Sequence, residues 1–184
     1  QVNGKPLAEK RSELCYLAFN KPVGIMTSMD PNGHETIATF LDLKERLFPI
    51  GRLDVASSGL LILTNDGELS ATIMHPSHDH EKEYIVTLEQ EIQNEDLEKM
   101  ASGMMILGSK TKPAKILRVG KNRFHITLTE GRNRQIRRMC EQLGHEVRAL
   151  KRIRIMNIEL GNLLTGTTRL LTQKEISILK SLSM

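Results

Sequence analysis

An arginine and an aspartate stand close together in GRLDVASSGLL, residues 51–61, directly ahead of an apolar run. A loop aspartate followed by Ser57 is typical of a residue that caps its own turn. A carboxylate held ionised by an arginine is instead typical of a nucleophile or a general base. The residues alone leave both interpretations of Asp54 open.

Basic residues are concentrated between residues 132 and 154. This stretch holds eight basic and two acidic residues, a charge of +6, whereas the whole chain carries +4. A basic stripe on a near-neutral body favours a nucleic-acid partner, although a solvated surface has the same pattern. The residues of this stretch that we expect to contact RNA are Arg132, Arg134, Arg138, Lys151, Arg152 and Arg154.

The same stretch contains the clearest helix of the sequence, over residues 133–143. The apolar residues that repeat at i, i+3, i+4 and i+7 are Ile136, Met139, Cys140 and Leu143. Gly144 then ends the helix. The arginines lie at the start of this helix, where the helix dipole is positive and further positive charge is unfavourable. An anion is therefore expected beside them, either a phosphate or a carboxylate. Arg137 lies at the edge of the apolar face and suits an ion pair with a protein carboxylate, whereas Arg134 and Arg138 suit phosphates.

Tyr84 is one of two tyrosines and lies in a predicted strand. A strand tyrosine ordinarily packs in a core, but beside a flipped nucleobase its ring can stack while its hydroxyl handles a proton. Both interpretations stay open. Lys82, two residues earlier, joins the residues that we expect to contact RNA.

Three histidines and an aspartate lie close together in the sequence, and they are His75, His78, Asp79 and His80. Their HxxHxH spacing matches no common metal-ligand pattern, and no second cluster completes it. We therefore expect polar loop residues here and no metal site. A metal-dependent RNA hydrolase is the weaker alternative.

Short strands and helices must position these groups. Strands are expected at residues 14–19, 48–53, 59–63, 83–88, 114–119, 124–129, 146–150 and 152–160. Helices are expected at residues 36–43, 69–74, 95–102 and 133–143. A last helix follows the capping box of Thr172 and Glu175, and Asn94 is the expected N-cap of the third helix. Strands and helices without a regular βαβ alternation indicate an α+β fold.

The composition is typical of one soluble globular domain. The chain has 184 residues, of which 39% are hydrophobic and 26% charged. No apolar segment reaches the ~18–20 residues of a membrane span, and no signal-peptide pattern opens the chain. Cys15 and Cys140 form no CxxC pair, which favours a reduced, cytoplasmic setting.

Three motifs in this order resemble those of the pseudouridine synthases, in the form used by the RsuA branch. They are GRLD at residues 51–54, KEY at residues 82–84, and GRNRQIRRM at residues 131–139. The opening strand followed by NKPVG, residues 20–24, is similar to the same branch. Each motif is weak alone, but together they are specific.

The resemblance covers residues 12–182 and implies a fold and a reaction. The fold is an α+β catalytic domain with a long, mainly antiparallel mixed sheet, flanking helices and a central active-site cleft. The reaction is isomerisation of uridine to pseudouridine after base flipping, without a metal or an organic cofactor. Residues 48–54, 79–84 and 154–157 most resemble branch members that modify bacterial large-subunit (23S) ribosomal RNA, which is the implied partner.

The resemblance also implies roles for single residues. Asp54 is the nucleophile, Tyr84 stacks on the base and takes the C5 proton, and Arg137 pairs with Asp54. Ile136 helps to wall the base pocket. Arg52 fills the space that the flipped base leaves.

Residues 1–11 resemble the tail of a missing N-terminal S4-like RNA-binding domain, and residues 12–184 the catalytic domain, which we expect to be a monomer. The main alternative is a catalytically silent RNA-binding or ribosome-assembly module with the same fold. The set of Asp54, Tyr84 and Arg137 argues against that alternative.

Overall fold

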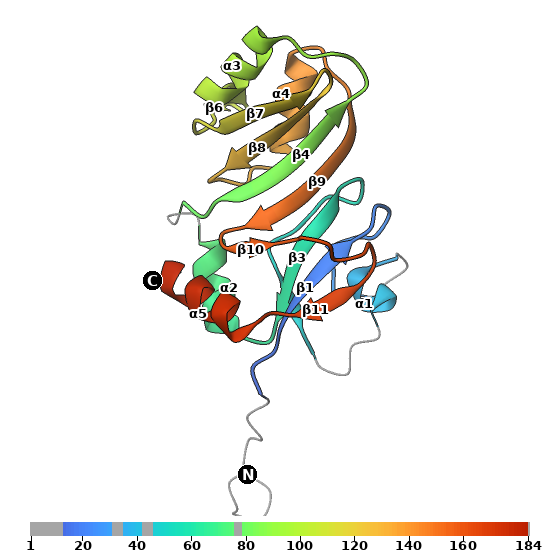
Figure 1. Ribbon diagram of the computed structural model, residues 1–184, viewed down its shortest axis with the longest axis vertical. Coiled ribbons are helices and arrows are strands. Elements are labelled where there is room, and N and C mark those ends of the chain that lie inside the picture. Colours follow the sequence, from blue (N-terminus) through green and yellow to red (C-terminus); the bar gives the residue numbers. More distant parts are fainter. Residues whose placement is uncertain (1–12, 31–34, 42–45, 76–78, 184) are drawn as a thin grey trace, which may run out of the picture.

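Figure 1 shows the computed structural model, which describes residues 13–30, 35–41, 46–75 and 79–183. The tail expected over residues 1–11 lies outside these residues. The helices are α1 (Ile37–Phe40), α2 (Gly67–Met74), α3 (Asn94–Ser102), α4 (Gln135–Gln142) and α5 (Gln173–Leu182).

Most strands form one mixed sheet in the order β11-β1-β3-β9-β4-β8-β7, with β2 paired to β3 and β10 to β9. These strands are β1 (Tyr16–Lys21), β2 (Phe48–Ile50), β3 (Ser58–Thr64), β4 (Lys82–Leu88), β7 (Lys115–Gly120), β8 (Arg123–Leu128), β9 (Val147–Ile155), β10 (Ile158–Glu159) and β11 (Thr168–Leu170). A separate hairpin pairs β5 (Met105–Ile106) with β6 (Ser109–Lys110). The pairings of the large sheet are antiparallel apart from β3 with β9, which confirms the expected mainly antiparallel mixed sheet.

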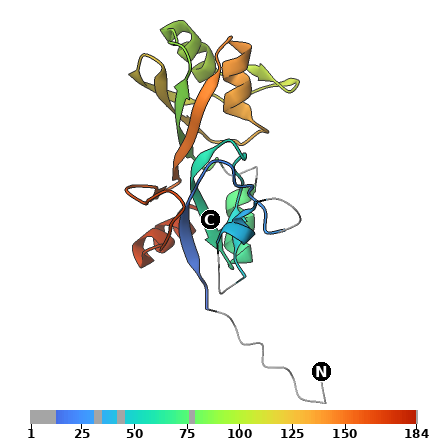
Figure 2. The same ribbon diagram turned by 90° about the vertical axis from the view of Figure 1, so that its right-hand side faces the viewer.

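The sheet has two halves, stacked along the long axis of the molecule (Figures 1 and 2). One half holds β1, β2, β3 and β11 with α1, α2 and α5, and the other holds β4, β7 and β8 with α3 and α4. Strand β9 joins them, since it pairs with β4 on one side and with β3 on the other. The β3–β9 pairing is short, with Ser58 opposite Lys151 and Gly59 opposite Arg152.

The half around β1 and β3 is covered on both faces. Successive strand residues point to opposite faces. Leu60 and Ile62 therefore pack with residues of α2 and α5, whereas Phe19 and Leu61 pack with Ile37 of α1. The apolar run after the GRLD motif is thus buried on both faces, as its unbroken hydrophobicity predicts.

The other half has its core between the sheet and the helices α3 and α4. The α4 residues buried in this core are Ile136, Met139 and Cys140. This confirms the apolar face predicted for residues 133–143, although the helix itself is shorter. Gly144 has φ of 79°, in the left-handed region, and follows the helix as predicted.

Several expectations about element boundaries are wrong. The strand expected at residues 48–53 ends at Ile50, as β2, and the helix expected at residues 36–43 is the short α1, whose C-cap is Leu41. Asn94 is the first residue of α3 and not its cap, and its side chain accepts a hydrogen bond from Arg118 Nη1 at 2.6 Å. The strands expected at residues 146–150 and 152–160 form one continuous strand, β9, followed by the short β10.

Candidate active site

Asp54 lies in the loop between β2 and β3, and hydrogen bonds hold this loop on both sides of it. Thr27 Oγ1 donates to Leu53 O at 2.8 Å and accepts from Leu53 N at 3.2 Å. After Asp54, Val55 O accepts from Gly24 N at 2.9 Å. Thr27 could not be found from the sequence, because a single threonine between Met26 and Ser28 gives no signal of such a contact.

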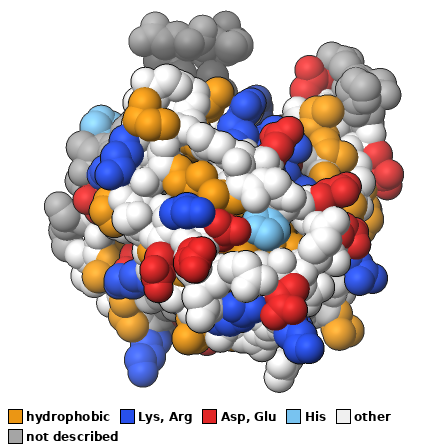
Figure 3. Space-filling view, turned by 90° about the horizontal axis from the view of Figure 1, so that it is seen from above, with side chains coloured by type: hydrophobic (Ala, Val, Ile, Leu, Met, Phe, Trp, Pro, Cys, Tyr) orange, Lys and Arg blue, Asp and Glu red, His pale blue; other side chains and the backbone are white. Residues whose placement is uncertain are grey.

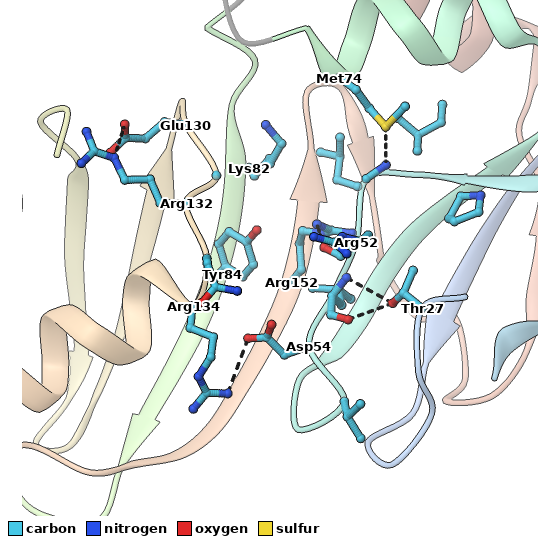
Figure 4. Close-up of a pocket in the computed structure, with 18 of the residues that line it drawn as sticks. Thr27, Arg52, Asp54, Met74, Lys82, Tyr84, Glu130, Arg132, Arg134 and Arg152 are labelled. Carbon is cyan, nitrogen blue, oxygen red and sulfur yellow. Dashed lines mark hydrogen bonds and ion pairs between the residues drawn. The ribbon is translucent and has the colours of Figure 1, made fainter. Parts of the chain in front are cut away.

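The turn after Asp54 is closed by its main chain. Ser57 N donates to Asp54 O at 3.0 Å. The turn therefore uses the backbone carbonyl, and the carboxylate, which is 34% exposed, points toward Arg134 (Figure 4). The side chain of Asp54 is thus available for chemistry in the way that the second interpretation requires.

Arg134 reaches Asp54 from the start of α4. Its Nη1 lies 4.0 Å from Asp54 Oδ2. Arg134 is the N-cap residue of α4 and has φ of 51° and ψ of 35°. This left-handed conformation costs a residue with a Cβ roughly 1–2 kcal/mol. Strain of this kind persists where the surrounding structure holds a residue in place, and it is concentrated at functional sites.

The ion pair predicted between Arg137 and Asp54 is made by Arg134 instead. Arg137 Nη2 donates to Ala56 O at 2.8 Å, and Nη1 donates to Val147 O at 3.3 Å. Arg137 therefore holds the backbone of the loop just beyond Asp54. Burial and the charge of Arg134 lower the pKa of Arg137, while the nearby charge of Asp54 raises it. The difference arises because the helix begins one residue after Arg134, which leaves that side chain free to extend toward the loop.

Tyr84 enters the site from β4. The Arg152 guanidinium carbon lies 6.0 Å from the centroid of its ring. On the core side, Tyr84 packs against the cluster that contains Ile136. Ile136 is 4% exposed and is not among the residues that line the cavity described below, so its role in walling a base pocket stays a prediction.

A cavity of about 1380 Å³ brings Asp54 and Tyr84 together. Segments from both halves of the sheet line it, including residues 49–56 and 129–134 (Figure 4). Its charged lining residues are Arg52, Asp54, Lys82, Lys112, Glu130, Arg132, Arg134 and Arg152. Six of these are cationic, so the cavity attracts a polyanion. It exceeds the ~300–1,000 Å³ of typical small-molecule sites, which leaves room for more than one nucleotide.

Comparison with known proteins shows the family of this chain. Residues 15–142 match the family model described as RNA pseudouridylate synthase. The chain belongs to the RNA pseudouridylate synthase family. It is 44% identical over 177 residues to the dual-specificity RNA pseudouridine synthase RluF of Escherichia coli (strain K12), covering 96% of this chain and 61% of that protein. It is 39% identical over 191 residues to the ribosomal large subunit pseudouridine synthase B of Bacillus subtilis (strain 168), covering 100% and 78%.

The fold is that of the family as well. A crystal structure described as that of a pseudouridylate synthase matches with a TM-score of 0.85 at 37% identity, covering 91% of this chain and 74% of that one. This confirms the expected α+β fold and the resemblance to the RsuA branch. The chain spans about three fifths of the length of the RluF protein that it matches.

Two arginines that we expected to contact RNA form ion pairs with glutamates of the protein. Arg154 forms ion pairs with Glu81 at 3.0 Å and with Glu83 at 2.9 Å. Arg132 pairs with Glu130 at 3.1 Å and also donates to the β5–β6 hairpin. Contact with a phosphate would have to compete with these partners.

Arg138 and Arg152 are bound within the protein too. Arg138 donates to the main-chain and side-chain oxygens of Asn133 at 3.0 and 3.2 Å, and Arg152 is 2% exposed. The face seen in Figure 3, at the α3 end of the molecule, carries acidic side chains interspersed with basic ones. Lys151 makes no ion pair with any residue that the structure describes. Within the described ranges, the cavity-lining cations outside any ion pair are Arg52, Lys82 and Arg152.

Lys21 is a buried cation that the sequence analysis treated only as part of the NKPVG motif. Its Nζ donates to Pro22 O at 2.8 Å and to Ile25 O at 2.7 Å. Burial lowers the pKa of Lys21 to about 8, and the charge of Arg152 acts in the same direction, whereas the charge of Asp54 opposes the shift. A lysine at a strand end gives no sign of burial in the sequence.

Among the residues that the structure describes, no group of three or more His, Cys, Asp or Glu side chains could hold a metal ion. His78 lies outside the described residues. In the same part of the chain, none of the helices has the length and apolar character needed to cross a bilayer.

Proposed function

We propose that this chain isomerises uridine to pseudouridine in RNA. The observation that carries the proposal is that Asp54 and Tyr84, which come from opposite halves of the sheet, line one cavity with six cationic side chains. A carboxylate beside an arginine suits a nucleophile. An aromatic hydroxyl in the same cavity suits stacking on a base and proton transfer. Membership of the RNA pseudouridylate synthase family supports this assignment.

The reaction first requires the target base to leave its stack, which costs a few kcal/mol. Contacts between phosphates and the cavity cations, Arg52 and Lys82 among them, offset this cost. Asp54 then acts at the ribose, either by attack on C1′ or through a glycal-type route. The C1′–N1 bond breaks, the uracil turns, and a C1′–C5 bond forms. On the first route the Asp54–C1′ bond breaks in this last step and frees the carboxylate, and on the second the proton that Asp54 took from C2′ returns to C2′. Tyr84 takes the proton from C5 and N1 gains one, so the product is an isomer of the substrate.

We further propose that the substrate is bacterial large-subunit (23S) ribosomal RNA, and that the protein acts in the cytoplasm as a monomer. The similarity to RluF, and to a relative named for the large ribosomal subunit, supports the choice of RNA. The cavity and both proposed catalytic groups come from one chain, which supports the monomer.

The substrate is tested with the purified chain and two sets of transcripts, from large-subunit and from small-subunit ribosomal RNA. Pseudouridine is mapped by carbodiimide labelling and primer extension, with and without EDTA. We expect chelator-resistant modification at discrete uridines of the large-subunit transcripts. Modification of the small-subunit transcripts alone would contradict the proposal that large-subunit ribosomal RNA is the substrate. RNA binding without modification would favour the silent module, and loss of activity in EDTA would favour a metal-dependent enzyme.

A further inference from the structure

The junction between the two halves of the sheet is centred on Arg152. The backbone of Arg152 is in register with Gly59 of β3 on one side and with Tyr84 of β4 on the other. Strand β3 begins directly after the loop that carries Asp54. One residue therefore lies between the strand of Tyr84 and the strand that anchors Asp54.

The two strands meet too closely for a side chain at residue 59. Gly59 has φ of 105°, and a Cβ built there would lie 2.2 Å from Arg152 O. Backbone oxygens and Cβ atoms do not approach so closely, and the φ itself favours glycine. The spacing at the junction is therefore set by direct backbone contact between Gly59 and Arg152.

The side chain of Arg152 strengthens the same junction. Its Nε donates to Leu60 O at 2.7 Å and its Nη1 to Arg52 O at 3.3 Å. Arg52 is two residues before Asp54, and Leu60 follows Gly59 in β3. Arg152 thus holds the Asp54 loop at both of its ends, while its guanidinium lies beside the ring of Tyr84 (Figure 4).

Burying Arg152 in this way lowers the stability of the fold. Arg152 is 2% exposed, forms no ion pair with any described carboxylate, and leaves Nη2 buried without a hydrogen-bond partner in the described part of the chain. A buried charge without a counter-charge destabilises a protein. Arg118, in the edge strand β7, is an arginine whose hydrogen bonds are all made, since its Nε, Nη1 and Nη2 atoms each donate one. Such a local cost is typical of a functional site.

We propose that Arg152 is a positioning residue for the isomerisation, one that sets the distance between Asp54 and Tyr84. This inference rests on the proposed function. Arg152 acts through the carbonyls of Arg52 and Leu60, and its planar guanidinium can hold both at once. A lysine keeps the charge but is a single ammonium group without this fork geometry.

The test compares Arg152→Lys and Arg152→Gln with the wild-type chain and with Arg118→Lys. We expect kcat for pseudouridine formation to fall about 100-fold in both Arg152 variants, because a displacement of about 1 Å between reacting groups can cost that much. The Kd for substrate RNA should change less than about threefold, since few phosphate contacts are removed. Arg118→Lys removes a guanidinium that also holds backbone carbonyls, but away from the cavity, so kcat should stay within about twofold of wild type.

Activities are normalised to the folded fraction measured by circular dichroism. A kcat loss that disappears on this normalisation, or one that Arg118→Lys shares, would overturn the proposal and assign Arg152 a purely structural role. An unchanged kcat in both Arg152 variants would overturn it as well.

A second measurement separates this proposal from the proposed function. Wild type and Asp54→Asn are run in the same assay, and an inactive wild type would refute the proposed reaction. The positioning claim is then read from crystal structures. We expect the loop over residues 51–57 to shift relative to Tyr84 in Arg152→Lys and to stay in place in Arg118→Lys. An unshifted loop would contradict the positioning role whatever the reaction is.

Discussion

At the scale of single residues, the backbone of Arg134 is the unusual feature of the site. Its φ of 51° puts a Cβ-bearing residue in the left-handed region, where its guanidinium comes within 4.0 Å of Asp54. This pair is half exposed, so the ion pair itself contributes little, roughly 0–1 kcal/mol. The strain is therefore not offset by the ion pair, which points to a role in binding or turnover.

We predict that Arg134→Gly raises the free energy of unfolding by about 1 kcal/mol, because glycine adopts this backbone conformation without strain. The matched control is Arg134→Ala, which loses the same guanidinium but keeps a Cβ and the strain. Urea unfolding of the two variants measures the difference. If both variants have the same stability, the backbone of Arg134 is not strained in the way described.

Arg137 leads to a different prediction, because its contacts are with the loop and not with the carboxylate. Arg137→Gln removes a half-buried cation near Asp54 and weakens the hold on Ala56. We expect kcat to fall about 100-fold with little change in RNA affinity, as for other displacements of a reacting group. Single-turnover assays with excess enzyme separate the two effects. A variant that binds RNA more weakly but turns over normally would show that Arg137 contacts RNA instead.

At the scale of elements, α5 shows how one carboxylate can secure a helix end. Its capping box of Thr172 and Glu175 confirms the prediction from sequence. Glu175 also accepts two hydrogen bonds from Arg169 of β11, at 2.7 and 2.9 Å. The Arg169 contact is the main cause that lowers the pKa of Glu175 to about 2, from an ordinary value of 4.5. The ionised form therefore stabilises the fold fully above pH 4.5, and this contribution is lost as the pH falls toward 2.

We predict that Glu175→Gln lowers the free energy of unfolding by about 1 kcal/mol at pH 7, because glutamine can keep the capping box but loses the two charged hydrogen bonds with Arg169. The difference from wild type should shrink below pH 4.5 and be nearly gone by pH 2. Denaturant unfolding at a series of pH values measures it, with Glu159→Gln on the neighbouring β10 as the control. A difference that does not depend on pH would mean that the ionised carboxylate is not the stabilising species.

At the scale of the whole molecule, the fold pairs only part of the basic stripe. Among the described residues, Arg132 and Arg154 are held by carboxylates, whereas Lys151 and the cavity cations Arg52 and Lys82 make no ion pair. Arg52 is exposed, and its guanidinium makes no ion pair with any described residue, whereas Arg154 is held by Glu81 and Glu83. The location of RNA binding thus depends on which arginines the fold has already paired.

We predict that Arg52→Gln weakens the salt dependence of RNA binding. The negative slope of the logarithm of the association constant against the logarithm of salt concentration should become shallower by about one, because one phosphate contact is lost. Arg154→Gln should leave this slope unchanged. The measurement is a salt titration of binding to the same transcript. Equal changes in slope for both variants would contradict the division between free and paired arginines.

Much of this architecture could be predicted from the sequence, since the order of the motifs and the apolar periodicity of α4 depend on residue type alone. The partner of Asp54 could not, because it depends on where α4 begins, and the left-handed backbone of Arg134 leaves no trace in the residue pattern. The burial of Arg152 was missed for a related reason. Arg152 is buried because β3 and β9, which are far apart in the chain, pair there through only two residues of each strand.

The central claim is that the carboxylate of Asp54 performs the chemistry in a cavity that binds RNA independently of it. Asp54→Asn tests this most directly, because the side chain keeps its size and loses only its charge and nucleophilicity. Pseudouridine formation and RNA affinity are measured on the same large-subunit transcript. The account predicts that no pseudouridine forms while the Kd for RNA stays within about threefold of wild type. Pseudouridine formation by Asp54→Asn at the wild-type rate would contradict it.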